Sequence, residues 1–557
     1  MDATTRFETR AVGALPVIAR YMEALGLSDA VDEAVPWEGG VPLGTLVEVL
    51  VANRLLRPTA LFRVDEWAGR AAVADYYGLG GGQLNDDRLG RALERLAAHA
   101  DTIQAALVVR AVRRFGLDVS QVHYDITDVE LYGAYDLGVP AGAEGEAPPA
   151  KPTPLPAYGR TKSGRKNVKQ VQLGLDVTGD GGVPVLHAPL DGNAAEATTH
   201  VDNLRRLRQA LAAKPGRELL YVADTKLDAP ENLLAVGAGN GRFLCGGVFS
   251  PQLKEMYLAR RGELRPVDYH PKSQDGLPPE ERDQYKAFEL GQELSGRVGD
   301  GNGRKAKVKY RLVFVWSQAK ARQEAETRER HVAKARAGFE AVGRNLNRYS
   351  LKTRDAIVRR LEADRGRYAE GKLLTYELTE DAPGHFRLQW GADEKGLERR
   401  KLLEGVYALK TNLPPRDYPL AAVLAKYKEQ SKVERRIHHL KGPLAVAPMF
   451  LKNPDRIAGL LCVLVWALMV LALMERQVRR KLRGKPLYGL YPEGRPSPAP
   501  TGPAPLDCFS ALCAVIVKER GAVARRLAQP TDIQRKLLNL LGIPPDALRT
   551  FKRRCGM

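Results

Sequence analysis

Cysteine is scarce in this sequence, and no two cysteines form a CxxC pair. Five Cys in 557 residues are too few and too scattered for a zinc ribbon or a disulfide framework, which favours a reducing compartment. The first ten residues, MDATTRFETR, carry acids and contain no apolar stretch. A secretory signal is therefore not expected there.

Lysine is absent from the first 115 residues, which hold 13 Arg and 15 acids. The whole chain is nevertheless basic, with 86 Lys and Arg against 66 Asp and Glu, a net charge of +20. The excess lies in residues 301–375, with 20 basic and 8 acidic residues, and in residues 425–485, with 14 and 4. A solvated helical face would carry balancing acids, so we expect a polyanion such as nucleic acid to lie along the second half of the chain.

Long apolar runs are missing too, with one exception. Ile457–Met474 is 18 consecutive apolar residues, the length of a transmembrane helix candidate. The run contains Gly and several Ala, and a central helix of a large fold can be apolar on all sides. A buried core helix is the prediction, and a membrane span is the alternative.

Periodicity and composition predict five segments. They are a helical N-terminal domain at 1–115, the first part of a catalytic domain at 116–255, an insertion at 256–412, the second part of the catalytic domain at 413–485, and a Pro-rich linker with a helical tail at 486–557. Helices are expected at Gly44–Leu56, Leu89–Ala98, Ala194–Ala213, Tyr418–Lys441 and Pro454–Arg480. Strands are expected at Val119–Thr127, Lys169–Val177, Val183–Leu190, Glu218–Ala223 and, within the insertion, Lys307–Trp316. This order predicts a mixed α/β sheet covered by helices.

Two aspartates lie at the ends of predicted strands. Asp125 lies in HYDITD and Asp224 in YVADTK, and carboxylates at adjacent strand ends converge on one edge of a sheet. With a third acid they could hold two Mg²⁺ ions for phosphodiester chemistry. Each Asp alone is more often a turn former or a helix cap, and Asp128 and Asp228 are close rivals.

A third acid stands out in YKEQSKVERRIHHLK. At 100° per residue, Tyr427, Gln430, Glu434 and Lys441 fall within about 60° of one another on a single helix. Such a helix could pack its apolar edge on the sheet and point this stripe at a ligand. The alternative is an ordinary amphipathic helix with a polar border.

The spacing of Tyr427, Gln430, Glu434 and Lys441 resembles the Tyr/Arg/Glu/Lys signature of one large group of DDE transposases from bacterial insertion sequences, with Gln in place of the usual Arg. HYDITDVELYG, LLYVADTKLDAPENL and VERRIHHLKGPLAVAPMFLKNPDRIAGLL resemble three blocks of one branch of that group, in the same order. LNDDRLGRAL near the N-terminus extends the resemblance over most of the chain.

The resemblance implies an RNase-H-like catalytic core with a β-containing insertion between its second and third acids. Asp125, Asp224 and Glu434 become the catalytic, metal-binding triad for two Mg²⁺ ions, with Mn²⁺ as a possible substitute. Residues expected to contact DNA are Tyr427, Gln430, Lys441, Lys162, Arg165, Lys166, Lys305, Lys307 and Lys309. Gln430 lacks the charge and the fork of Arg, which puts one phosphate contact in doubt.

The function that this resemblance implies is transposition in a bacterial cytoplasm, next to the nucleoid. The protein would bind the terminal inverted repeats of its element as double-stranded DNA, as a homodimer in the paired-end complex and without a membrane, then cleave the ends and join them to target DNA. The N-terminal domain is the expected reader of the ends, through Arg on one face such as Arg88, Arg91 and Arg95. The alternatives are an inactive DNA-binding relative and a non-transposing RNase-H-like nuclease.

Overall fold

A computed structural model describes residues 6–548 except 134–153, 160–163, 166, 196–197, 212–217, 239–240, 299–303, 447–448, 520–521 and 545–547. Two compact units make up the chain. Unit 1 comprises Met1–Arg242, Val298–Arg304 and Glu429–Met557, and unit 2 comprises Phe243–Arg297 and Lys305–Lys428. Unit 2 contains most of the insertion predicted at 256–412 and extends beyond it at both ends.

Unit 1 contains a mixed sheet around one central strand, β2. Its strands are β2 (Gln121–Leu131), β3 (Ala157–Tyr158), β4 (Lys169–Thr178), β5 (Pro184–Leu190) and β6 (Leu220–Ala223). β4 pairs antiparallel with β2, β3 and β5, whereas β6 runs parallel to β2. α8 (Thr199–Leu211) makes the crossover from β5 to β6 and α9 (Pro230–Ala238) follows β6. The order β5-β4-β2-β6 with this crossover fits an RNase-H-like core, so the predicted mixed α/β class is confirmed.

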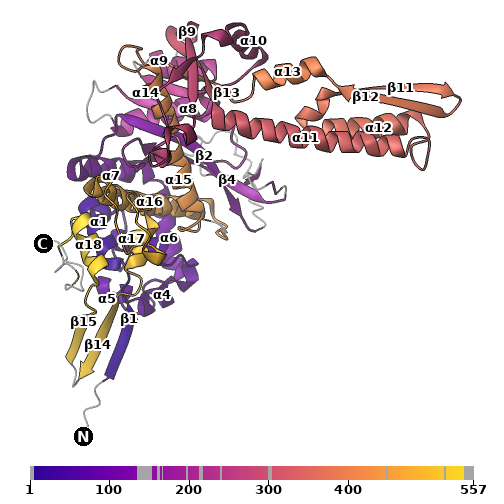
Figure 1. Ribbon diagram of the computed structural model, residues 1–557. Helices are drawn as coiled ribbons and strands as arrows, with labels where there is room; N and C mark the ends of the chain where they lie inside the picture. The colour runs from indigo at the N-terminus through magenta and orange to yellow at the C-terminus, as the bar shows by residue number, and fades with distance from the viewer. Residues whose placement is uncertain are drawn as a thin grey trace, which may run out of the picture. The chain divides into compact units, whose positions relative to one another are not determined.

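The N-terminal helices and the C-terminal part of unit 1 pack around one long helix, α16 (Pro454–Leu482) (Figure 1). The helices are α1 (Leu15–Leu25), α2 (Leu27–Ala34), α3 (Leu43–Leu56), α4 (Val64–Arg70), α5 (Val73–Tyr77), α6 (Asp86–Ala97), α7 (Ala100–Phe115), α15 (Ser431–Lys441), α17 (Pro503–Cys508) and α18 (Asp532–Leu541). α16 contacts α6, α3, β5 and α18. In the described residues α16 is long and apolar enough to cross a membrane, and its most apolar 18-residue window is completely buried, as the core-helix prediction requires.

Two sequence predictions for the chain ends are wrong. The N-terminal segment is not purely helical, because β1 (Arg6–Ala11) pairs antiparallel with β14 (Cys513–Glu519), which pairs with β15 (Ala522–Leu527). The C-terminal segment is therefore not only a linker and a helical tail. The short alternating run CAVIVKE carries the strand signal. Its partner strand lies about 500 residues away in sequence, where local reasoning does not reach.

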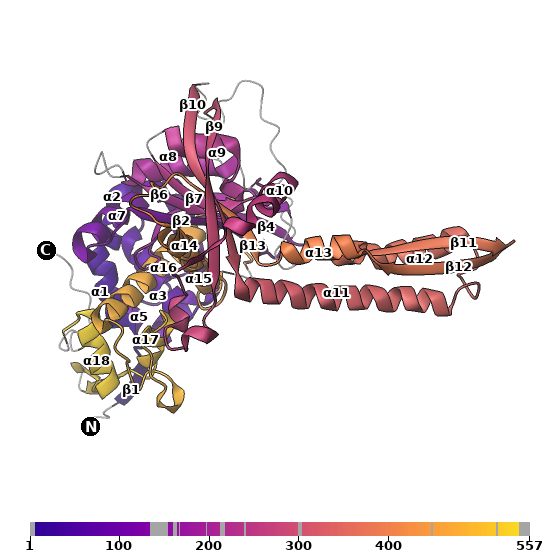
Figure 2. The same ribbon diagram turned by 45° about the horizontal axis from the view of Figure 1, so that its top comes forward.

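Unit 2 has an antiparallel sheet in the order β7-β13-β10-β9-β8. The strands are β7 (Arg242–Gly247), β8 (Arg265–Val267), β9 (Tyr285–Arg297), β10 (Lys305–Ser317) and β13 (Val406–Thr411), and the helices beside them are α10 (Pro251–Arg260), α13 (Glu394–Leu402) and α14 (Leu420–Lys428). Beyond the sheet, α11 (Gln318–Arg344) and α12 (Arg354–Gly366) lie along the hairpin of β11 (Leu374–Ala382) and β12 (His385–Ala392) (Figure 2). Phe339, Ile357, Leu361 and Phe386 share a core there.

Candidate active site

Asp125 and Asp224 lie at the same level of two neighbouring strands. The parallel pairing of β2 with β6 ends at His123 and Val222. Two residues further along each chain come Asp125 and Asp224, and neighbouring strands are about 5 Å apart. Both aspartates are half-buried. The register therefore places the two acids at the same level of neighbouring strands, with Asp224 directly after the end of β6. Asp125 is the fifth of the eleven residues of β2, so the prediction that it lies at the end of its strand is wrong.

Each of these aspartates also has a local backbone contact. Asp125 Oδ1 accepts a hydrogen bond from the Ile126 N–H at 2.8 Å. Asp224 Oδ1 accepts from the Lys226 N–H at 2.8 Å and caps a short 3₁₀ turn. The cap is the ordinary role of an Asp after a strand, and it engages one oxygen of the carboxylate.

Helix α15, which carries Glu434, runs alongside β2. Its start is fixed where Gln430 Nε2 donates to the Tyr124 carbonyl at 2.9 Å, and its end where Lys441 Nζ donates to Asp128 Oδ1 at 3.2 Å. The four residues from Gln430 to Glu434 rise about 6 Å along the helix, which is the length of about two residues of a strand. Glu434 thus comes about level with Ile126, one residue beyond Asp125, and its side chain is exposed.

The three predicted acids are not assembled into a metal cluster. Across the described part of the chain, no group of three His, Cys, Asp or Glu side chains is arranged to hold a metal ion. Asp125 and Asp224 supply the carboxylate oxygens that Mg²⁺ prefers, but Glu434 would have to turn inward to join them. Three negative charges repel one another at close range, so a separated triad is expected until a cation offsets that repulsion.

Gln430 faces the sheet and not a ligand. Its Oε1 accepts a hydrogen bond from His123 Nδ1 at 3.1 Å, and its Nε2 donates to the Tyr124 carbonyl. On the other side of the ring, Gln121 Nε2 donates to His123 Nε2 at 2.8 Å and to Glu429 at 2.8 Å. The tautomer of His123 with its proton on Nδ1 satisfies this whole chain of bonds. An Arg at position 430 could not accept that proton, so Gln in place of the usual Arg suits a structural role here.

The single helix predicted over Tyr418–Lys441 is interrupted. α14 ends at Lys428 and α15 begins at Ser431, because Glu429 and Gln430 are held by β2 in a tight turn. In that turn the N–H groups of Lys432 and Val433 bond three residues back. Tyr427 consequently lies on α14 in unit 2, stacked on Tyr407, and the predicted one-helix stripe is wrong.

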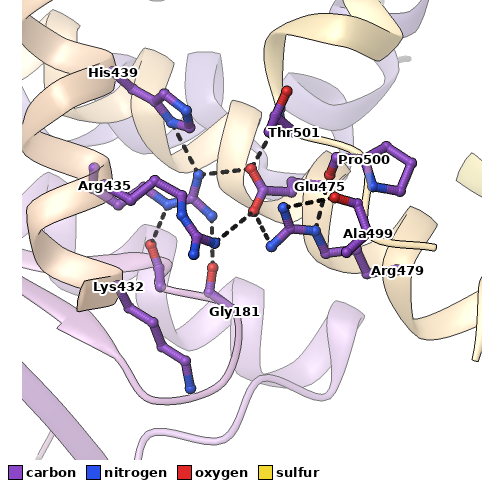
Figure 3. A network of polar contacts seen from close by, with 12 residues as sticks. Gly181, Lys432, Arg435, His439, Glu475, Arg479, Ala499, Pro500 and Thr501 are labelled. Atoms are coloured by element: carbon purple, nitrogen blue, oxygen red, sulfur yellow. Dashed lines mark hydrogen bonds and ion pairs between the residues drawn. The ribbon is translucent and has the colours of Figure 1, made fainter. Parts of the chain in front are cut away.

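A buried ion-pair network holds the back of α15, and the sequence analysis missed it. Arg436 donates to the Gly181 and Gly182 carbonyls at 2.7 and 2.9 Å and pairs with Glu475 of α16 at 3.0 Å. Glu475 also pairs with Arg479 at 2.6 Å (Figure 3). The signal available in the sequence was Glu475 itself, a lone acid directly after the 18-residue apolar run.

The other predicted DNA contacts are scattered. Lys305, Lys307 and Lys309 are exposed at alternate positions of β10, so they share one face of unit 2, and Lys307 pairs with Glu293 at 2.8 Å. Arg165 donates to the Tyr132 hydroxyl at 2.6 Å. Lys162 and Lys166 lie outside the described residues.

The arginines predicted to read element ends do share a surface. Arg88, Arg91 and Arg95 of α6 line a cavity of about 760 Å³ together with Trp37. Arg91 and Arg95 are exposed, whereas Arg88 donates to the Gln83 carbonyl at 2.6 Å. Glu38 and Glu94 line the same cavity, so the three arginines share a face on which the charges are mixed.

Comparisons with known proteins find a matching family model and six matching chains among the solved structures. A family model described as a domain of unknown function, DUF4277, matches residues 7–107. A crystal structure of a pre-cleavage Mos1 transpososome is similar at 14% identity and a TM-score of 0.16, covering 41% of this chain and 68% of that chain. The curated proteins contain no match. At this TM-score the similarity supports no assignment, so residue roles rest on the chain's own geometry.

Proposed function

We propose that this protein is a DDE transposase that cleaves DNA at the ends of its element and joins the freed 3′-hydroxyl to target DNA. The observation that carries the proposal is the common level of Asp125 and Asp224 on parallel strands, with the Glu434 helix alongside. Two carboxylates at the same level of neighbouring strands favour a divalent-cation site next to a phosphodiester. The ordered sequence blocks around the three acids support the same reading.

The chain's own residues would act as follows. Asp125 and Asp224 would hold Mg²⁺ through their oxygens, and Glu434 would complete the set by rotating toward the sheet. Bound Mg²⁺ would activate the attacking water or 3′-hydroxyl and stabilise the leaving oxygen. Lys441, whose side chain is 37% exposed beside Asp128, would orient a DNA phosphate through its remaining N–H groups.

The test is a cleavage assay with purified protein, Mg²⁺ and DNA that carries the ends of its own element, resolved on a denaturing gel. Asp125→Asn, Asp224→Asn and Glu434→Gln should each abolish cutting while DNA binding persists. Asp202→Asn is the matched control, because Asp202 is an exposed carboxylate on α8 and lies outside the proposed triad and its rivals. Cutting by Glu434→Gln at the wild-type rate would refute the triad, and Glu429 and Asp128 would be tested next.

A non-transposing nuclease with the same triad is the second candidate. It would cut the DNA but leave the 3′-hydroxyl free. A labelled end that becomes covalently joined to a second DNA supports transposition, and cutting without joining supports the nuclease.

A further inference from the structure

Unit 1 contains a large basic groove that the proposed chemistry does not use. It has a volume of about 1480 Å³ and lies where α1, α7, α16 and α18 meet. Its basic lining residues are Arg20, Arg114, Arg480, Lys481, Arg483 and Lys485. Among the described lining residues Glu23 is the single carboxylate, and it pairs with Arg20 at 2.9 Å.

The partial negative charges of nearby helix C-termini offset only part of the positive charge in the groove. α7, α16 and α18 all end at the groove, with Phe115, Leu482 and Leu541. Each helix C-terminus carries about half a negative charge, so three ends offset about 1.5 units. Six basic residues and one acid leave a formal +5. The remaining excess has no protein counter-charge among the lining residues and attracts a polyanion.

The shape and the floor of the groove indicate which polyanion fits. Small-molecule pockets rarely exceed about 1,000 Å³ and are mostly apolar, whereas this groove is larger and rimmed by exposed cations. Its aromatic floor is already occupied, because Tyr21 stacks on Phe115 at 5.6 Å between ring centroids and donates to the Leu541 carbonyl. Rings stacked on each other are not free to stack on bases, which favours a phosphate backbone over unpaired bases.

We infer that this groove binds the phosphate backbone of duplex DNA outside the cleavage site. The inference rests on the proposed function for the identity of its polymer. Arg114, Arg483 and Lys485 are exposed, come from two different helix ends, and would each neutralise one phosphate. A second backbone contact of this kind would hold the element end in register while the acids act on it.

The test compares the full chain with a triple variant, Arg114→Gln, Arg483→Gln and Lys485→Gln, by fluorescence anisotropy without divalent metal. The probe is a labelled duplex of about 30 base pairs of arbitrary sequence, titrated between about 50 and 200 mM salt. The affinity should fall about tenfold or more, and the slope of log affinity against log salt should shrink by about 2.7, or 0.9 per lost phosphate contact. Arg63→Gln, Arg526→Gln and Lys536→Gln, three exposed cations outside the groove, form the charge-matched control.

Each of the other possible outcomes would contradict a different part of the proposal. If the triple variant and the control lose affinity equally, the groove is not a DNA site, and the proposed transposase function is unaffected. If the triple variant loses affinity for a single strand alone, the duplex assignment is wrong. If the wild type binds no duplex at any salt concentration, both the groove assignment and the proposed function fail. Equal melting temperatures of the variants would show that lost binding is not lost folding.

Discussion

Arg436 of α15 and Glu475 of α16 form an ion pair of 3.0 Å in which both side chains are 2% exposed. Glu475 also accepts the Gly502 N–H at 2.8 Å, so one carboxylate joins α15, α16 and the start of α17. Burial alone would raise the pKa of Glu475, but the charges of Arg436 and Arg479 bring it below its ordinary value. The helix that carries Glu434 is thus fixed from behind by a charge that stays ionised at neutral pH.

Removing this carboxylate charge should destabilise unit 1 strongly. Glu475→Gln leaves Arg436 and Arg479 with no buried counter-charge, and breaking a buried pair from one side costs about 3–5 kcal/mol. The measurement is chemical denaturation followed by circular dichroism. Glu23→Gln, which removes an exposed partner of Arg20, is the control and should change the free energy of unfolding by less than about 0.5 kcal/mol. Similar small changes in both variants would show that the Glu475 network contributes little.

His439 should make unit 1 less stable in mild acid. It is buried beside Arg436, with its Nδ1 at 3.2 Å from Nη1. Burial and the nearby Arg436 charge lower its pKa from 6.5 to about 4. The unfolded chain therefore binds a proton between pH 6.5 and 4 that the folded chain refuses, and stability falls as the pH drops through this window.

His439→Gln removes that proton-linked contribution. Unfolding free energies measured at about pH 7 and pH 4.5 should differ less in this variant than in the wild type, by up to about 1.4 kcal/mol per pH unit. His438→Gln, at the exposed neighbour, should leave the wild-type difference intact. An unchanged difference in His439→Gln would assign the acid sensitivity to other groups.

Asp176 should make unit 1 less stable as the pH rises, which is the opposite of the pH dependence that His439 produces. It is completely buried on β4, and Asn203 Nδ2 donates to both of its oxygens at 2.9 and 3.1 Å. Burial raises its pKa from 3.8 to about 8, despite the hydrogen bond from Asn203 and the charge of Arg206. The folded chain therefore keeps a proton that the unfolded chain loses, and stability falls as the pH rises from about 4 to 8.

The cleanest window for this effect is pH 7 to 8, where histidines with an ordinary pKa of about 6.5 are mostly neutral in the unfolded chain. Wild-type stability should decrease there by up to about 1.4 kcal/mol per pH unit. Asp176→Asn keeps the shape without the charge and should flatten the decrease, as read from denaturation midpoints. Asp202→Asn, at an exposed carboxylate on α8, should retain it. A decrease of equal steepness in Asp176→Asn would contradict the assignment.

Local patterns were enough to predict the strands and the core helix. Alternation and bounding turns located β2, β4 and β5 to within a few residues, and the unbroken apolar run located α16, because burial on all sides needs apolar residues on all sides. The break between α14 and α15 could not be predicted, since Glu429 and Gln430 are good helix formers. Residues of β2 about 300 positions earlier, Gln121, His123 and Tyr124, bond to them in the turn. The three acids could be proposed from the sequence because each follows or flanks a local signal, whereas Arg436 becomes important only through its partner on another helix.

The crossing of α16 and α6 depends on the missing side chain of Gly459. A Cβ at this position would lie 2.1 Å from the Leu93 carbonyl oxygen and 2.6 Å from its carbon, both backbone atoms of α6. Gly459→Ala must therefore push the helices apart, at a cost of about 1–3 kcal/mol that outweighs the gain of about 1 kcal/mol from replacing Gly in a helix. Gly69→Ala on α4 meets no atom within 4 Å and should be neutral or slightly stabilising. Melting curves of the two variants would decide: if Gly459→Ala is as stable as Gly69→Ala, α16 has room to shift and the close crossing does not limit the core.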